Sequence, residues 1–319
     1  MMKTLTIFTP AYNRAHTLDR TYKSMCNQTN HDFEWLVIDD GSVDNTRALV
    51  LSYLVDVFYV SDNEFYGNSK DATWLKVHYI YQQNQGMHGA HNTAYDNINT
   101  ELNTCIDSDD YMPNDAVEKI LDRWSSISEE ERKLYAGLVA LDVDSEKMEV
   151  IGTLLPTSKK STTINAFYQN GGQGDKKLIY RTDVIKSVPK YPIFAGEKYV
   201  SLGYKYRLVD QHYELLILNE AVCIVDYQMD GSSHSMYKQY WTNPKGWAFS
   251  RKIEMQYTNS LTRKFLVCGH YVYSCIRSKN RYFLSDSPCK LLTFLSIPLG
   301  VLMYFYIKGK VKHNVTFKL

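Results

Sequence analysis

The chain has 319 residues, of which 44% are hydrophobic, with 36 basic residues against 35 acidic ones. This length and composition suffice for one large domain or two modest domains with a real core, so a disordered protein is excluded. The balanced charge excludes the global positive field of a typical nucleic-acid-binding protein, and no nucleic-acid partner is expected.

Strand-like apolar runs alternate with helical patterns through the first third of the chain. Strands are predicted over 5–9, 33–39, 76–81 and 102–107, and helices around 18–25, through 46–54 and after residue 92. The polar stretch 61–72 is interpreted as a surface excursion. Nearly continuous apolar strands separated by helices predict an α/β fold with a mostly parallel sheet and helices on both faces.

The same pattern continues with a helix over 115–124 and a strand over 134–143. The glycine-rich, polar stretch 157–177 is predicted to be a mobile loop. Residues 178–227 mix both patterns, and from about residue 231 the chain is aromatic and basic. We therefore expect an α/β domain over 1–228 and a helical, aromatic extension over 229–319.

The cysteines and the N-terminus both indicate a cytosolic protein. Six cysteines lack the paired spacing of a zinc ribbon or a disulfide framework, which predicts reduced thiols. The chain opens on the strand-like run TLTIFTP (4–10) without a signal-peptide pattern, so export is not expected.

Polar segments follow the predicted strands: PAYNR, DDGS, QNQGMHG and DSDD. Parallel strands bind ligands at their carboxyl ends. Asp107 and Asp109, separated by one residue, can bind one hard cation, Mg²⁺ or Mn²⁺, which also takes phosphate oxygens of a substrate. Alternatively, Asp109 or Asp110 caps a helix that begins at Pro113, and the other carboxylates are solvated.

Four segments, in this order and spacing, resemble the nucleotide-sugar domain of family 2 glycosyltransferases: IFTPAYNRAHTLDRTYKSMCNQT, FEWLVIDDGSVDNT, QQNQGMHGAHNTAY and CIDSDDYMPNDAV. The resemblance covers residues 3–120 closely and 178–228 more loosely. It implies a Rossmann-like GT-A fold with a donor-binding half (1–120) and an acceptor half (121–228). It also implies an inverting, metal-dependent transfer of a sugar from a nucleotide-diphosphate donor, for which we expect a UDP-sugar.

The resemblance also implies site residues. They are Thr9, Pro10, Tyr12 and Arg14 beside the nucleoside; Asp39 and Asp40 at the base and ribose; Gly86, His88 and His91 near the nucleotide; Asp107 and Ser108 at the diphosphate; and Asp107 and Asp109 at the cation. Many relatives carry arginine where this chain has His91, so the alternative is that His88 and His91 are structural.

An inverting transfer needs a base that deprotonates the acceptor hydroxyl. The family places this carboxylate in a Glu-Asp pair after a glycine-rich loop, and the corresponding stretch here is IFAGEKYVSLGY (193–204). Glu197 is present, but Lys198 replaces the aspartate. We expect Glu197 to be the base; the alternative is a carboxylate at a helix N-terminus.

The loop over 227–246 supplies further candidates. His234 is expected to reach the metal or a phosphate, and the alternative is a solvated side chain. Trp241 and Trp247 either stack on sugar rings or pack the extension.

The C-terminal region predicts a membrane partner. Leu291–Ile307 is uncharged, and its flanks carry Lys290, Lys308, Lys310 and Lys312. This stretch is near the lower limit for a spanning helix and contains Pro298 and Gly300, so an interfacial or hairpin segment, a span and a buried helix all remain open. We expect segment 290–308 to associate with the inner face of a bacterial cytoplasmic membrane. The acceptor is then a lipid-linked glycan of a capsule or exopolysaccharide, while the oligomeric state stays open.

Two other functions are considered. The first is a catalytically silent nucleotide-sugar or membrane-binding module, an alternative that remains because Lys198 replaces the expected aspartate. A nucleotidyltransferase would also use a parallel sheet and carboxylates, but its glycine-rich loop with a lysine is absent from TPAYNRAHT (9–17).

Overall fold

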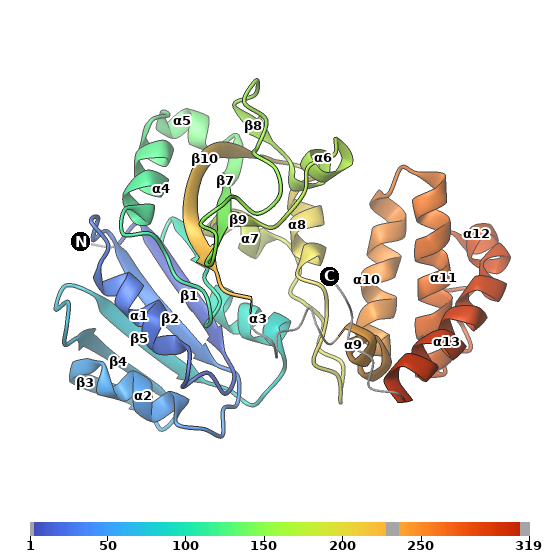
Figure 1. Ribbon diagram of the computed structural model, residues 1–319, viewed down its shortest axis with the longest axis horizontal. Helices are drawn as coiled ribbons and strands as arrows, with labels where there is room; N and C mark the ends of the chain where they lie inside the picture. Colours follow the sequence, from blue (N-terminus) through green and yellow to red (C-terminus); the bar gives the residue numbers. More distant parts are fainter. Residues whose placement is uncertain (1–2, 228–235, 313–319) are drawn as a thin grey trace. The chain divides into compact units, whose positions relative to one another are not determined.

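The computed structural model describes residues 3–227 and 236–312, which form two compact units (Figure 1). Unit 1 contains residues 3–190 and 205–227. Unit 2 contains residues 191–204 and the described C-terminal residues 236–312. The boundary expected at residue 228 between the α/β domain and the extension lies outside the described residues. Segment 191–204, which we assigned to the α/β domain, belongs to unit 2.

Unit 1 is built on a ten-stranded sheet in the order β3-β4-β5-β2-β1-β6-β9-β7-β10-β8. The strands are β1 (Leu5–Ala11), β2 (Phe33–Asp39), β3 (Leu54–Ser61), β4 (Glu64–Ser69), β5 (Lys76–Tyr81), β6 (Leu102–Cys105), β7 (Tyr135–Asp144), β8 (Ser161–Thr162), β9 (Lys176–Arg181) and β10 (Glu214–Val225). Strands β5, β2, β1 and β6 are parallel neighbours, and β10 is parallel to β7. Strand β9 runs antiparallel between β6 and β7.

The helices that contribute to unit 1 are α1 (Leu18–Cys26), α2 (Thr46–Ser52), α3 (Met87–Asn97), α4 (Ala116–Ser125), α5 (Glu129–Arg132), α6 (Ile164–Gln169), α7 (Thr182–Ser187) and α8 (Gly203–Val209). Helix α4 shows why the sequence folds this way: Val117, Ile120, Leu121 and Trp124 recur at helical spacing and are all buried. The apolar strand residues and such helix faces form one core on the sheet.

Two stretches without an obvious strand pattern extend this sheet. The predicted helix through 46–54 ends at Ser52, and the chain then forms the antiparallel hairpin β3–β4. The expected surface excursion therefore holds a strand, whose Phe65 stacks on Tyr79 of β5 at 4.5 Å. The stretch 157–177 likewise contains β8, α6 and the start of β9. Strands β4 and β8 lie in polar or glycine-containing stretches, whereas β3 is an apolar run that directly follows the predicted helix and was not separated from it.

Unit 2 is helical, as predicted for the extension, with α9 (Met236–Thr242), α10 (Pro244–Tyr257), α11 (Leu261–Ser278), α12 (Lys290–Leu295) and α13 (Ile297–Lys312). Helices α11 and α13 approach closely at two glycines. A Cβ at Gly300 would lie 2.4 Å from Val272, and one at Gly269 would lie 2.6 Å from Leu299. No helix within residues 3–227 and 236–312 is long and apolar enough to cross a membrane. All six cysteines are free.

Hydrogen bonds hold segment 191–204 against the N-terminus of α10. The backbone N–H groups of Lys245 and Gly246 donate to the two carboxylate oxygens of Glu197 at 3.0 and 2.8 Å. Lys198 N donates to Asn243 Oδ1 at 2.7 Å. A Cβ on Gly246 would lie 1.8 Å from the carbonyl oxygen of Tyr199, so the close contact requires glycine.

We predict that Gly246→Ala forces segment 191–204 away from α10 and lowers the free energy of unfolding of unit 2 by about 1–3 kcal/mol, the usual cost of overpacking. The matched control is Gly309→Ala on α13, where an added Cβ meets nothing within 4 Å. Thermal unfolding followed by circular dichroism measures both. Equal stability of the two variants would contradict the close packing.

Candidate active site

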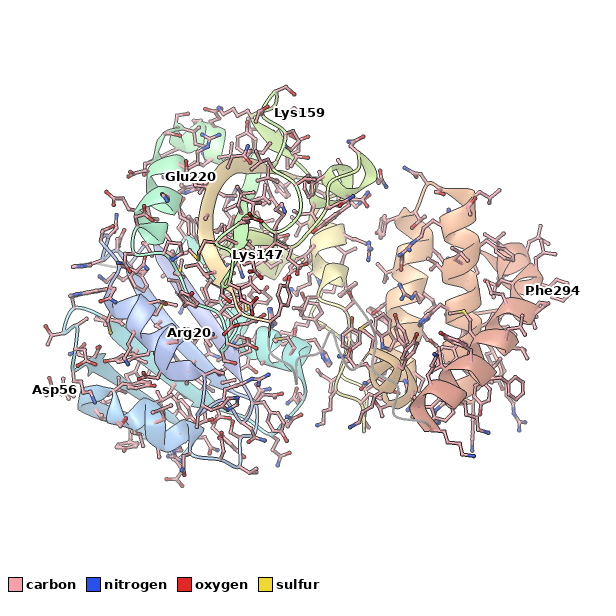
Figure 2. The ribbon with its side chains drawn as sticks, in the orientation of Figure 1. Arg20, Asp56, Lys147, Lys159, Glu220 and Phe294 are labelled. Atoms are coloured by element: carbon pink, nitrogen blue, oxygen red, sulfur yellow. The ribbon has the colours of Figure 1, made fainter. Side chains whose placement is uncertain are left out.

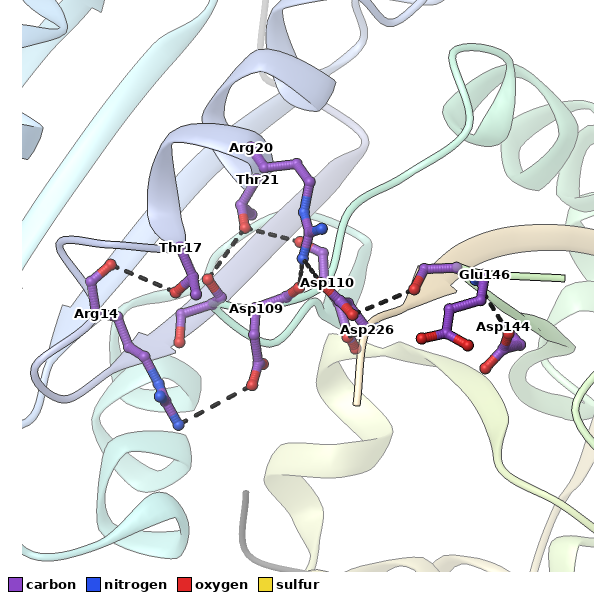
Figure 3. A network of polar contacts seen from close by, with 11 residues as sticks. Arg14, Thr17, Arg20, Thr21, Asp109, Asp110, Asp144, Glu146 and Asp226 are labelled. Carbon is purple, nitrogen blue, oxygen red and sulfur yellow. Dashed lines mark hydrogen bonds and ion pairs between the residues drawn. The ribbon is translucent and has the colours of Figure 1, made fainter. Parts of the chain in front are cut away.

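The carboxyl ends of β1, β2, β5, β6, β7 and β10 lie at one edge of the sheet, which we call the polar edge. The site residues expected in unit 1 lie at the ends of β1 and β2, in the loops after β1, β2, β5 and β6, and on the first turns of α3. Side chains of this edge are drawn in Figures 2 and 3.

Asp40 binds the loop after β5 to the loop after β2. Its carboxylate accepts hydrogen bonds from the backbone N–H groups of Gln85 and Gly86, each at 2.8 Å, and from Gln82 Nε2 at 2.7 Å. The neighbouring Asp39 is also buried and accepts from Ser42 N at 2.8 Å and from the Tyr79 hydroxyl at 2.6 Å. Both aspartates therefore shape the loops in which a nucleoside is expected to lie.

The four residues expected beside the nucleoside differ in exposure. Thr9 and Pro10 are buried, and Thr9 Oγ1 accepts from Trp35 Nε1 at 3.0 Å. Tyr12 is 50% exposed, and the Arg14 guanidinium lies 4.0 Å from Asp109 (Figure 3). Tyr12 and Arg14 are thus the two that present side-chain surface at the edge.

The loop after β5 leads into α3 through Gly86, whose φ of +86° favours glycine. His88 and His91 lie on the first turns of α3 and are buried. The His91 ring contacts Phe8 at 5.0 Å between centroids, and its Nδ1 is 2.9 Å from the carbonyl oxygen of Met87. Burial lowers the pKa of His91 to about 4, so the ring is neutral at pH 7. This environment is that of a core histidine.

The loop after β6 holds the acidic cluster. Asp107 and Asp109 are partly exposed, whereas Ser108 and Asp110 are buried. Asp110 N donates to the carbonyl oxygen of Asp107 at 3.0 Å, which closes a tight turn. The alternative role of Asp109 or Asp110 as a helix cap is wrong, because α4 begins at Ala116 with Asp115 at its N-cap.

Cations from other elements fix this loop. Arg20 of α1 donates to the carbonyl oxygen of Asp109 at 2.6 Å and pairs with Asp226 at 2.5 Å (Figure 3). Asp226 N in turn donates to Asp110 Oδ1 at 3.1 Å. Burial raises the pKa of Asp110 to about 7; Lys177 opposes this shift and Asp107 adds to it.

A divalent cation fits the chemistry of Asp107 and Asp109. No group of three histidine, cysteine or carboxylate ligands exists among the described residues. Mg²⁺ and Mn²⁺ sites that carry phosphates commonly use only one or two carboxylates, with phosphate and water oxygens completing the shell. His234, the other expected ligand, lies outside the described residues.

Four residues of the polar edge were not predicted from the sequence: Arg20, Asp142, Lys177 and Asp226. Lys177 Nζ lies 3.9 Å from Asp142 Oδ1, and both side chains are largely buried. Asp142 and Asp226 stand near the ends of apolar runs, the same signal that identified Asp107. Arg20 and Lys177 have no such signal, because their partners come from distant strands.

The expected base, Glu197, lies in unit 2. Glu197 is 7% exposed, and its carboxylate accepts hydrogen bonds from two backbone N–H groups at the N-terminus of α10. This is the arrangement expected for the alternative role, a carboxylate at a helix N-terminus. Its assignment as a base stays a prediction. Trp247 stacks on Tyr199 at 4.5 Å and Trp241 contacts Tyr304 at 5.6 Å, so both tryptophans pack within unit 2.

Comparison with known proteins finds similarity to glycosyltransferases over part of the chain. Residues 6–129 match the family model described as "Glycosyl transferase family 2". Chondroitin synthase of Escherichia coli is 33% identical over 120 residues, which are 38% of this chain and 15% of that protein. A GalNAc(5)-diNAcBac-PP-undecaprenol beta-1,3-glucosyltransferase of Campylobacter jejuni is 28% identical over 122 residues, 38% of this chain and 35% of that protein. The chain therefore spans a minor part of these relatives.

Among solved structures, residues 1–349 of S. aureus TarS superpose with a TM-score of 0.53 at 16% identity, covering 99% of this chain and 93% of that chain. TarS has also been solved in complex with UDP and with UDP-GlcNAc. This similarity confirms the predicted GT-A fold.

Proposed function

We propose that this chain, whose residues 6–129 belong to glycosyl transferase family 2, is an inverting glycosyltransferase. It transfers a sugar from a UDP-sugar to a hydroxyl group of a growing, lipid-linked bacterial surface polysaccharide. The observation that carries the proposal is the partly exposed pair Asp107 and Asp109 at the polar edge, inside the matched segment.

The donor side rests on the loops after β1, β2 and β5. Tyr12 and Arg14 offer side-chain surface, while Asp39 and Asp40 hold the loops in place. The choice of a uridine nucleotide draws on the complexes of TarS with UDP and UDP-GlcNAc. The polysaccharide acceptor draws on the names of the chondroitin synthase and the undecaprenol-linked glucosyltransferase.

Asp107 and Asp109 would hold Mn²⁺ or Mg²⁺. When bound, such an ion neutralises the charge that develops on the departing diphosphate. Ser108, between them, would face the diphosphate. Arg20 keeps the Asp109 peptide in place through its hydrogen bond to the carbonyl oxygen, so the carboxylates do not need to reorganise.

Glu197 is the proposed base for the acceptor hydroxyl. Removal of this proton is needed as the oxygen attacks C1 of the sugar. The carboxylate is anchored by two backbone N–H groups, which fixes its orientation.

The C-terminal helices support a membrane partner for the same enzyme. Helices α12 and α13 expose six large apolar side chains, each more than half exposed: Leu291, Phe294, Leu295, Leu302, Phe305 and Tyr306. We call this set the apolar patch; Phe294 is labelled on α12 in Figure 2. Residues 290–312 contain four lysines and no acidic residue. An apolar face flanked by lysines fits the inner, anionic face of the bacterial cytoplasmic membrane.

The rival functions make different predictions for turnover. A catalytically silent module binds UDP or vesicles without releasing UDP from a UDP-sugar. A nucleotidyltransferase requires a nucleoside triphosphate and releases diphosphate. Calorimetric titration with UDP, GDP, CDP and dTDP, with and without Mn²⁺, followed by assays of UDP release, separates these cases.

For Asp109→Asn we expect Mn²⁺-dependent UDP binding to weaken at least tenfold, because one charged ligand of the cation is lost while the loop keeps its shape. Isothermal titration calorimetry measures the effect. Asp122→Asn, on the exposed side of α4, is the matched control and should bind as the unmodified protein does. Metal-dependent binding that survives Asp109→Asn would show that the cation is held elsewhere.

For Glu197→Gln we expect UDP binding within about twofold of the unmodified protein and turnover lower by about 10²–10⁴-fold, the usual contribution of a general base. Glutamine keeps one of the two acceptors for α10 and loses the other, so circular dichroism and thermal unfolding must first show that the variant is folded. Glu220→Gln, at an exposed position of β10, serves as the control. If the Glu197 variant turns over at the normal rate, another group is the base.

For the double variant Leu302→Glu and Phe305→Glu we expect loss of co-sedimentation with vesicles that contain phosphatidylglycerol, since two charges enter the apolar patch. The control Phe58→Glu changes a side chain on β3 that is 68% exposed. Vesicles of phosphatidylcholine alone should bind the unmodified protein weakly. If the unmodified protein does not bind anionic vesicles, the membrane proposal is wrong. If light scattering shows a dimer that the double variant abolishes, the partner of the apolar patch is a second copy of this chain.

A further inference from the structure

Lys177 is a charged residue inside unit 1, at the inner side of the polar edge. It lies near the start of β9, where this strand runs antiparallel between the carboxyl ends of β6 and β7. Its side chain is 13% exposed, and its Nζ donates to the carbonyl oxygen of Cys105, the last residue of β6, at 3.4 Å. The ammonium group therefore lies beside the peptide that leads into the Asp107–Asp110 loop.

The groups that face Lys177 come from four elements and are mostly acidic. They are Asp142 on β7, Cys223 on β10, Cys105, Asp107 and Asp110 at the end of β6 and in the following loop, and Tyr206 on α8. Although burial lowers the pKa of Lys177, Asp142 and the other acidic groups raise it well above its ordinary value. The side chain is thus a permanent cation at neutral pH.

Asp142 depends on this cation. The buried Asp142 Oδ1 has no hydrogen-bond partner in residues 3–227 and 236–312, and Lys177 Nζ at 3.9 Å is its ion-pair partner. Burial raises the pKa of Asp142 to about 6, and Lys177 opposes this shift, while Asp175 and Asp107 add to it and Lys176 opposes it. An uncompensated buried carboxylate is strongly unfavourable, so the ion pair decides whether Asp142 is charged.

The neighbouring Lys176 has a different environment. Its Nζ donates to the backbone carbonyls of Ile151, Gln173 and Asp175 at 2.8 to 3.0 Å. Backbone carbonyls do not titrate. The chain therefore contains a pair of adjacent lysines: Lys177 forms the ion pair with Asp142, whereas Lys176 is hydrogen-bonded to peptide groups and interacts with the carboxylates of Asp142 and Asp175 only through charge.

We propose that Lys177 is a positioning residue for the acidic loop, a fixed internal counter-ion on β9 that pairs with Asp142 of β7 on one side and holds the peptide at the end of β6 on the other. Cys223 lies opposite Asp142 on β10 and reaches Asp110 with its Sγ at 3.8 Å from Oδ2, which connects this pair to the loop. Lys177 thus supplies positive charge from the protein side, and Asp107 and Asp109 face the side where a ligand would enter.

The test is the pH dependence of unfolding in metal-free buffer with a chelator. In Lys177→Met the folded-state pKa of Asp142 rises further above its unfolded value, so stability is retained at low pH and lost as the pH increases. We expect the drop in Tm relative to the unmodified protein to be at least twice as large at pH 8 as at pH 5. Lys176→Met removes a weaker opposing charge, so the difference between its Tm losses at pH 8 and pH 5 should be smaller than that of Lys177→Met.

Two further variants keep the test decisive if Lys177→Met folds poorly. Adding Asp142→Asn to Lys177→Met removes the orphaned carboxylate and should recover at least half of the Tm loss at pH 8, and Lys177→Arg, which keeps the charge, should behave nearly as the unmodified protein. A Tm loss that is independent of pH, or a double variant no better than Lys177→Met, overturns the proposal and leaves a packing role.

Hydrogen exchange of the Asp110 amide reports on loop position, since this N–H is bonded to the Asp107 carbonyl. We expect exchange at least tenfold faster in Lys177→Met than in Lys177→Arg, and unchanged exchange contradicts positioning. We also expect Mn²⁺ with UDP to slow the exchange of this amide again in Lys177→Met, an expectation that rests on the proposed function. If the unmodified protein binds neither, that function fails while the pH result still decides the role of Lys177.

Discussion

Mutual repulsion of carboxylates is the constraint on which the polar edge depends. The sheet brings the aspartates of the loop after β6, Asp142 of β7 and Asp226, which follows β10, to the same edge. Such a concentration of like charge is tolerated only where cations or hydrogen-bond donors compensate it. The chain provides these from outside the acidic loops, with Arg20 on α1 and Lys177 on β9. Lys177 pairs with Asp142 at the inner side, whereas Asp107 and Asp109 are partly exposed, with Arg14 4.0 Å from Asp109.

The central strands and the acidic loop could be predicted from the sequence because their signals are local. Strands β2 and β5 match the predicted ranges 33–39 and 76–81, since their buried positions are apolar up to Asp39 at the end of β2 and polar residues follow both strands. The hairpin β3–β4 was missed because the apolar run of β3 directly follows the helical pattern of 46–54 and is mostly exposed, while β4 lies in a polar stretch. The hairpin is joined to the sheet by pairing of β4 with β5, the next strand in the chain.

The cationic residues of the site, Arg20 and Lys177, could not be predicted from the sequence because their partners lie far away along the chain. A lysine in KKLIYR (176–181) gives no hint of which neighbour enters the acidic cluster, because this depends on the register of β9 against β7. Glu197 differs from these cations, because its position in a motif singled it out in the sequence while its contacts with α10 were not predicted. The close approach of Gly246 to the Tyr199 carbonyl, which brings Glu197 to α10, has no sequence signature other than the glycine itself.

The hydrogen bonds of Asp40 have a consequence for ligand entry. Because the carboxylate already binds the N–H groups of Gln85 and Gly86, the loop after β5 loses its conformational entropy during folding and not during association. A nucleotide that binds as proposed would meet a loop that is already ordered. Its affinity would then reflect contacts and desolvation, with little ordering penalty, and binding would not have to wait for the loop to rearrange.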